Sequence, residues 1–218
     1  MLFFKSSSGA VHQESQPQEE VKGCGGGGGG DSGACVSLTV WRKSLLLTCN
    51  GFTVIDRSGN IVYRVDNYIG RPEEVILMDG LGKSVLTMCR SKKLGIAENW
   101  CVYEGEVGRE IRARKNPICR VRKNMNILHV APNSKVLAYV YDYRISDKKY
   151  AYSIEGSYGQ RSCKILDASR RVVAEVRRKE PINGGVCFGA EVFLLLVLPG
   201  FDSGLAMALV LLLDQMFS

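Results

Sequence analysis

The sequence has few of the residues on which enzymes and metal proteins commonly depend. It contains two histidines, His12 and His129, and none of its eight cysteines lies in a Cys-x-x-Cys pair, so we expect no metal site. It also lacks a Gly-x-Ser-x-Gly nucleophile motif. His129 lies in the strand-like run Ile127–Val130, where a lone histidine is most often structural. Because catalysis needs several convergent groups, we expect neither catalytic residues nor a cofactor.

Signals for secretion are absent as well. No Asn-x-Ser/Thr acceptor occurs, and the apolar run in Met1-Leu-Phe-Phe is too short for a signal peptide. We therefore expect a reducing compartment, either cytoplasmic, with peripheral attachment to the plasma membrane as an option, or nuclear. In such a compartment six cysteines among strand-like residues remain free thiols: Cys49, Cys89, Cys101, Cys119, Cys163 and Cys187.

The charge is unevenly distributed. The net charge is +7, but residues 1–36 hold two lysines against four acidic residues, a net charge of −2, which leaves +9 on the rest. Excess lysine and arginine is common on soluble surfaces, yet it also favours an acidic partner, either anionic phospholipid or an acidic protein. Nucleic acid is not expected, because the sequence lacks a helix-turn-helix, a zinc finger and an aromatic-rich RNA-binding signature.

Composition divides the chain at about residue 35. The segment before it contains the polar run Gln13–Glu20 and the unbroken Gly25–Gly30, which cannot bury enough apolar surface to offset the entropy of ordering. The glycine run lacks the Gly-Lys-Ser/Thr ending of a phosphate-binding loop, so we interpret it as a linker. We predict a disordered tail over residues 1–35 and one domain over residues 36–218.

Most of that domain has the pattern of short strands separated by turns. No long amphipathic helix interrupts it, which excludes parallel βαβ units and favours antiparallel connections. The predicted strands are Leu38–Thr48, Phe52–Ile55, Ile61–Val65, Glu74–Met78, Ser84–Cys89, Cys101–Tyr103, Arg109–Arg114, Ile118–Arg122, Ile127–Val130, Val136–Tyr143, Tyr150–Glu155, Cys163–Leu166, Val172–Arg177 and Glu191–Leu198.

One hairpin pattern recurs along the chain. Residues 52–65 and 163–176 share it around Asp56 and Asp167, and residues 75–88 repeat it more weakly around Asp79. An aspartate that opens a turn accepts a hydrogen bond from the backbone two residues on, so we expect these carboxylates to be structural. The alignment places two sets of residues on the core face: Ile61, Tyr63 and Val65 with Val172, Ala174 and Val176.

The last segment is apolar on every face. Every residue from Leu205 to Leu213 is apolar, whereas a surface helix would carry a polar stripe. The run is too short to cross a membrane, so no transmembrane span is expected. Asp202 or Ser203 can cap the start of a helix. We predict a helix buried on all sides within a closed sheet, with the core residues Leu205, Met207, Leu209, Leu212 and Leu213.

Several segments are similar to those of a plant family. Leu38-Thr-Val-Trp-Arg-Lys-Ser-Leu, Ile154-Glu-Gly-Ser-Tyr and Pro199-Gly-Phe-Asp-Ser-Gly-Leu-Ala-Met-Ala resemble the LURP-one-related family, in the same order. The resemblance implies the tubby C-terminal-like fold, a closed antiparallel β-barrel of about twelve strands around a hydrophobic C-terminal helix. It also implies a relation to phosphoinositide-binding tubby domains and to phospholipid scramblases, and a role in plant defence.

Candidate contact residues rest on charge, because no lipid-binding motif transfers from the resemblance. Alternate residues of a strand project from one face of a sheet, so basic residues in strand-like runs can gather on the outside of a barrel. Two interpretations stay open: a non-enzymatic binding or scaffold protein, and a peripheral protein that binds phosphoinositide or another anionic phospholipid. The candidate contacts are Arg109, Arg112, Arg114, Lys115, Arg177, Arg178 and Lys179.

Overall fold

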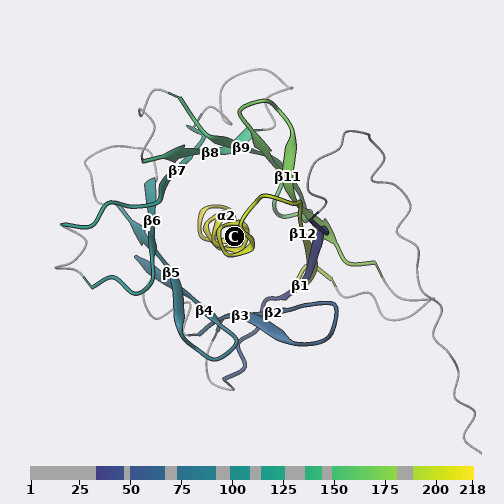
Figure 1. Cartoon of the computed structure of the whole chain (residues 1–218). Helices are drawn as coiled ribbons and strands as arrows, with labels where there is room; N and C mark the ends of the chain where they lie inside the picture. The colour runs from purple at the N-terminus through teal and green to yellow at the C-terminus, as the bar shows by residue number, and fades with distance from the viewer. Residues whose placement is uncertain are drawn as a thin grey trace, which may run out of the picture. The chain divides into compact units, whose positions relative to one another are not determined.

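Twelve strands pair in one closed cycle. The computed structural model describes residues 33–46, 50–66, 73–91, 99–108, 114–125, 136–143, 149–180 and 189–218. Within them, β1 pairs antiparallel with β2 on one side and with β12 on the other, so the sheet closes into the predicted barrel (Figure 1). The strands are β1 (Val36–Trp41), β2 (Phe52–Ile55), β3 (Ile61–Val65), β4 (Glu74–Asp79), β5 (Ser84–Arg90), β6 (Asn99–Glu104), β7 (Cys119–Lys123), β8 (Val136–Asp142), β9 (Tyr152–Ser157), β10 (Ser162–Asp167), β11 (Val172–Arg178) and β12 (Val192–Val197).

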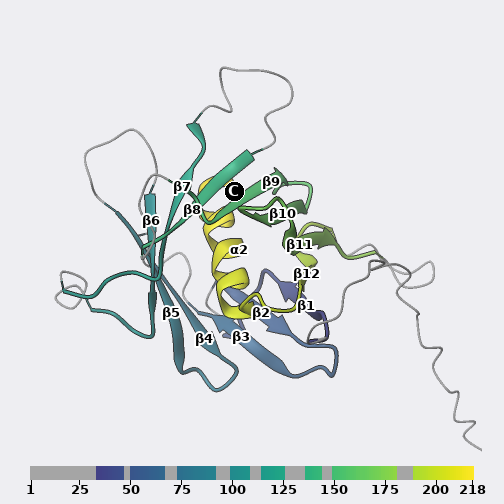
Figure 2. The same cartoon turned by 45° about the horizontal axis from the view of Figure 1, so that its top comes forward.

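The helix α2 (Ser203–Phe217) runs inside this barrel (Figures 1 and 2). Asp202 caps it, because the Asp202 Oδ1 accepts a hydrogen bond of 2.6 Å from the Leu205 amide. Every residue from Ala206 to Asp214 is buried. The predicted core residues Met207, Leu209, Leu212 and Leu213 are therefore confirmed, whereas Leu205, in the first turn, is half-buried and packs against the core.

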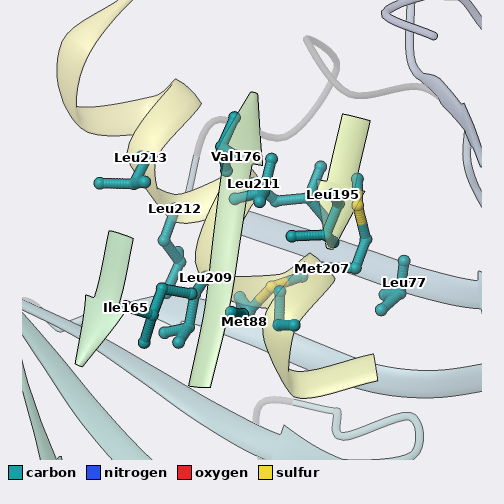
Figure 3. Close-up of a cluster of buried hydrophobic side chains, with 14 of the residues drawn as sticks. Leu77, Met88, Ile165, Val176, Leu195, Met207, Leu209, Leu211, Leu212 and Leu213 are labelled. Atoms are coloured by element: carbon teal, nitrogen blue, oxygen red, sulfur yellow. The ribbon is translucent and has the colours of Figure 1, made fainter. Parts of the chain in front are cut away.

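The strands supply the other half of the core through their inward side chains. On β12, Phe193, Leu195 and Val197 are at most 1% exposed, and the residues between them are half-buried. Figure 3 shows Leu195 beside side chains of α2, with Ile165 and Val176 from neighbouring strands. Burying one such side chain contributes roughly 1.5–3 kcal/mol. The helix is thus the filling of the barrel, and its buried side chains contribute to the stability of the fold.

Two details differ from the predictions. β1 ends at Trp41 and does not reach Thr48, because Ser44 is buried and turns the chain: its Oγ accepts from the Leu46 amide (3.1 Å). Ile61 is 37% exposed and Val172 is half-buried, although both were predicted on the core face, since each is the first residue of its strand, β3 and β11, at the barrel rim. The predicted strand over 127–130, with His129, lies outside the described residues.

The predicted hairpin repeat is present three times in the structure. In β2–β3, β4–β5 and β10–β11 an aspartate Oδ1 accepts hydrogen bonds from the amides two and four residues on, and a register shift precedes the aspartate. The structural role of these carboxylates is confirmed. The bonds are Ser58 and Asn60 to Asp56 (2.8 and 2.9 Å), Leu81 and Lys83 to Asp79 (both 2.9 Å), and Ser169 and Arg171 to Asp167 (2.8 and 2.9 Å).

The two ends of the barrel differ in their connections. One end, here the turn end, holds the first residues of α2 and the three aspartate turns, residues 56–60, 80–83 and 168–171. The other, here the loop end, holds the last turn of α2 and most of the longer connections, among them 42–51, 124–135 and 179–191. Contacts of Arg42 with Asp214 and of Lys123 with the Met216 carbonyl fix this orientation.

Candidate functional site

At the loop end the apolar interior gives way to a buried carboxylate. Asp214, in the last turn of α2, is 2% exposed, although negative charge is unfavourable near a helix C-terminus. Its Oδ1 accepts hydrogen bonds from the hydroxyls of Tyr158 (2.9 Å) and Ser218 (2.7 Å). Its Oδ2 lies 3.3 Å from Arg42 Nη2 without the geometry of a hydrogen bond. Two donors and one opposite charge therefore compensate for the burial of this group.

The same carboxylate is tied to the barrel wall through Tyr158. Burial, followed by the negative charge of Asp214, raises the pKa of Tyr158, so its hydroxyl remains a donor. The guanidinium Cζ of Arg161 lies 4.2 Å from the Tyr158 ring centroid and 4.5 Å from that of Phe193. Arg161 Nε donates to the Ala190 carbonyl (2.8 Å). These contacts fasten the end of α2 to β12 and to the connection between β9 and β10.

The predicted basic residues are divided between the two ends. Arg114 and Lys115 are exposed in the connection before β7, at the turn end, and Lys115 Nζ donates to the Glu104 carbonyl (2.7 Å). Arg114 therefore lies in a turn and not on the predicted strand. Arg109 and Arg112 lie outside the described residues.

The second basic group lies at the loop end, where β11 finishes. Arg177 and Arg178 are exposed and Lys179 is half-buried. Arg177 Nη2 is 2.7 Å from Glu175 Oε2, and Lys179 Nζ is 3.4 Å from Thr39 Oγ1. β8, β9 and β10 separate this group from β7. The described candidates therefore form two patches and not one site, and a carboxylate partly neutralises the patch on β11.

The loop after β1 presents a feature that the sequence prediction missed. Trp41 is 40% exposed, Leu45 43% and Leu46 47%, and Lys43 Nζ lies 5.4 Å from the Trp41 ring centroid. We call these four residues the β1–β2 loop patch. The sequence indicated this patch only by the apolar run after Trp41. Because that run was included in the predicted strand Leu38–Thr48, the patch was not recognised.

Four of the five described cysteines lie in strands of the barrel, whereas Cys35, before β1, is exposed. Cys89, Cys119 and Cys163 are buried and free, as predicted, and Cys101 is half-buried. Burial raises the pKa of Cys89 and Cys119 to about 12 and that of Cys163 to about 11, so they stay protonated and are weak nucleophiles. Cys49 and Cys187 lie outside the described residues, which contain no cluster of three or more metal-ligating side chains.

These features define a class of protein: a closed antiparallel β-barrel wrapped around its own C-terminal helix. Residues 36–214 match the LURP-one-related family, and the chain belongs to this family. It is 49% identical to Protein LURP-one-related 17 of Arabidopsis thaliana over 99% of both chains. It is 47% identical to Protein LURP-one-related 8 of the same plant, over 86% of this chain and 90% of the relative.

A solved structure supports the fold. The X-ray structure of an Arabidopsis thaliana protein matches with a TM-score of 0.59 and 22% sequence identity, covering 84% of this chain and 91% of that chain. At this identity the likeness concerns the fold alone. Within the ranges that the structure describes, no helix is both long and apolar enough for a membrane crossing.

Proposed function

We propose that this protein is a non-enzymatic binding or scaffold module that acts in plant defence signalling inside the cell. The single observation that carries the proposal is the filled barrel. Leu209, Val210 and Leu211 of α2 are 0% exposed, so the position that a ligand occupies in an open barrel is taken by the chain itself. Recognition is therefore assigned to the outer surface and to the connections, where binding residues are commonly found.

A second candidate function is peripheral binding to anionic phospholipid. The observation in its favour is the positive charge on the outer surface: Arg120 and Arg122 alternate on β7 with the buried Cys119 and Val121, so both arginines face outward. Each lysine or arginine close to an anionic membrane contributes about 1 kcal/mol. A few such residues give weak binding that salt reverses.

Two measurements with the full-length protein separate these functions. Flotation with phosphatidylcholine vesicles, with and without phosphoinositide, over a series of salt concentrations tests the lipid function. We expect a lipid-binding protein to float with the charged vesicles more completely at low salt than at high salt. Affinity capture from plant extract, quantified against a variant with Arg177 and Arg178 changed to Glu, tests the scaffold function. A partner lost by the folded variant supports an acidic protein ligand, whereas an identical capture profile rules out these two arginines.

A further inference from the structure

The described residues of the β1–β2 loop patch expose apolar side chains and are attached to the barrel by hydrogen bonds. Ser44 is 6% exposed and its hydroxyl donates to Asp66 Oδ1 (3.0 Å), while Arg64 Nε donates to Asp66 Oδ2 (3.0 Å). The Lys43 carbonyl accepts from Thr53 Oγ1 (2.8 Å), and the Arg42 amide donates to the Glu191 carbonyl (2.8 Å). The loop is thus held at several points, and the exposure of its two leucines is a built feature of the fold.

Lys43 gives the patch a positive charge that is available to a partner. Lys43 is exposed and contacts the Trp41 ring. Two acidic groups close to the loop in the fold have partners: Asp66 accepts from Ser44 and Arg64, and Glu191 lies 3.8 Å from Arg42. Glu180, which follows β11 at the same end of the barrel, is exposed. An apolar group with an exposed cation beside it complements an anionic surface. Tryptophan with neighbouring lysine is also the combination enriched at the boundary between lipid headgroups and acyl chains.

A further exposed apolar side chain lies on the opposite side of the same end of the barrel. Met125 follows β7 and is 41% exposed. β7 lies half-way round the closed strand order from β1, as the view along the barrel shows (Figure 1). Because β1 and β7 both finish at the loop end, Trp41 and Met125 lie on opposite sides of that end of the barrel. A flat partner can touch both sides at once, whereas a small pocket on a protein reaches one of them.

From these observations we propose that the loop end, led by the β1–β2 loop patch, is the face that docks on an anionic bilayer. Leu45 and Leu46 enter the headgroup region, Trp41 lies at its boundary, and Lys43 neutralises lipid charge. This inference rests on the lipid-binding candidate described above, and it deepens that candidate by moving the contact from the strand faces to a loop. The burial of apolar side chains also makes part of the affinity insensitive to salt.

The chain supplies its own probe for this contact. The sequence has two tryptophans, and Trp100 is 2% exposed in the core, so a change in emission on binding reports Trp41. Full-length protein is titrated with vesicles of phosphatidylcholine and with vesicles that also contain phosphatidylserine, without and with phosphoinositide. We expect a blue shift and quenching by brominated lipid with the anionic vesicles. The variant Trp41→Phe should still bind but lose the spectral change.

The deciding comparison uses two leucine changes of matched chemistry. Leu45→Ser with Leu46→Ser should weaken the vesicle partition by about tenfold or more, because the apolar contribution is removed. Leu81→Ser is the control, since Leu81 is 95% exposed at the turn end, and it should bind as the wild type does. Unchanged melting temperatures establish that both variants are folded. If the double variant melts early, Leu46→Ser alone replaces it.

Three results would overturn the inference, and they differ in what they leave standing. If the Leu45→Ser, Leu46→Ser variant still binds vesicles, or if wild-type binding leaves Trp41 emission unaltered, the loop is not the contact, although the lipid-binding function still stands. Absence of wild-type binding to every anionic vesicle removes the loop and the lipid function together. Loss of a captured protein in the double variant, without vesicle binding by the wild type, assigns the patch to a protein partner in place of a bilayer.

Discussion

The turn end and the loop end of the barrel close the same strands in different ways. At the turn end, Asp56, Asp79 and Asp167 repeat one set of backbone hydrogen bonds, and the apolar side chain of Leu81 is 95% exposed. At the loop end a buried carboxylate is tied to three neighbours, and exposed apolar residues surround it. The aspartate turns of the turn end are determined by hydrogen bonds between residues close in sequence. The loop end depends largely on contacts between segments that are distant in sequence.

The largest loss of stability is expected from changes to α2, the helix that runs between the two ends of the barrel. Leu209→Asp places a carboxylate where the side chain is 0% exposed, and loss of the leucine packing alone costs roughly 2–5 kcal/mol. Native stability is typically about 5–15 kcal/mol in total, so the variant should be insoluble or unfolded. The same holds for a chain that stops at Phe201. Circular dichroism and solubility check both, with Leu81→Asp as the control. A cooperatively melting chain that ends at Phe201 would contradict the role of α2 as the filling of the barrel.

A smaller effect is expected at the loop end, where the carboxylate is buried. Tyr158→Phe removes the donor to Asp214 Oδ1 and leaves the ring in place. A hydrogen bond to a buried charged group contributes about 1.5–3 kcal/mol. Urea unfolding should show a loss in this range. Tyr143→Phe, at a side chain that is 44% exposed, should show no loss. An equal loss of stability in the two variants would contradict a stabilising role for the buried hydrogen bond between Tyr158 and Asp214.

At the turn end, the left-handed residue of each loop allows a comparison within one molecule. Gly59, Gly82 and Arg170 hold the equivalent position with φ of 84°, 88° and 65°. Gly59→Ala should cost roughly 1–2 kcal/mol, because a Cβ is strained in this region although the space around it is open. Arg170→Gly should change stability little, since relief of strain offsets the loss of the ion pair with Glu155. Thermal unfolding of the two variants checks this asymmetry, and similar losses would argue against it.

Acid should weaken the turn end selectively. Hydrogen bonds from the Asn60 side chain and then its amide lower the pKa of Asp56, and the Arg171 amide chiefly lowers that of Asp167. A carboxylate whose pKa is depressed by folding stabilises the native state above its ordinary pKa, and this contribution is lost as the pH falls below about 4. The double variant Asp56→Asn, Asp167→Asn should therefore show a shallower acid dependence. Urea midpoints measured between neutral and acidic pH test the expectation, and parallel curves would count against it.

The smallest effect is expected for the segment before the barrel. Residues 1–35 have little apolar content, and Gly25–Gly30 should uncouple them from the domain over residues 36–218. Removal of residues 1–35 should leave the melting temperature within a few degrees. Scanning calorimetry of the shortened and full chains measures this difference. A large loss would assign the segment a place in the core.

The predictable parts of the molecule are those with a local pattern. The apolar run of α2 has one physical solution, a buried helix, and the aspartate turns depend on atoms within a few residues of each carboxylate. The position of Tyr158 beside Asp214 depends on the closure of the whole barrel, and no spacing in the sequence encodes it. Leu45 and Leu46 were assigned to a strand because apolar residues with β propensity have the same pattern in a loop, whereas the assignment of Trp41 to a strand is confirmed. Only the burial of Ser44 distinguishes the two.

The position of α2 in the sequence has a consequence for the order of synthesis and folding. β1 pairs with β12, and the 15 residues of α2 follow both strands in the chain. Translation proceeds at about 5–20 residues per second, so the barrel lacks its filling until α2 has been synthesised and has left the ribosome. Until then the inward leucines and the unpaired edges of β1 and β12 are open to aggregation. We expect ribosome-bound chains arrested at Phe201 to be digested by protease and folded chains that include α2 to resist it, because closure of the barrel waits for its helix.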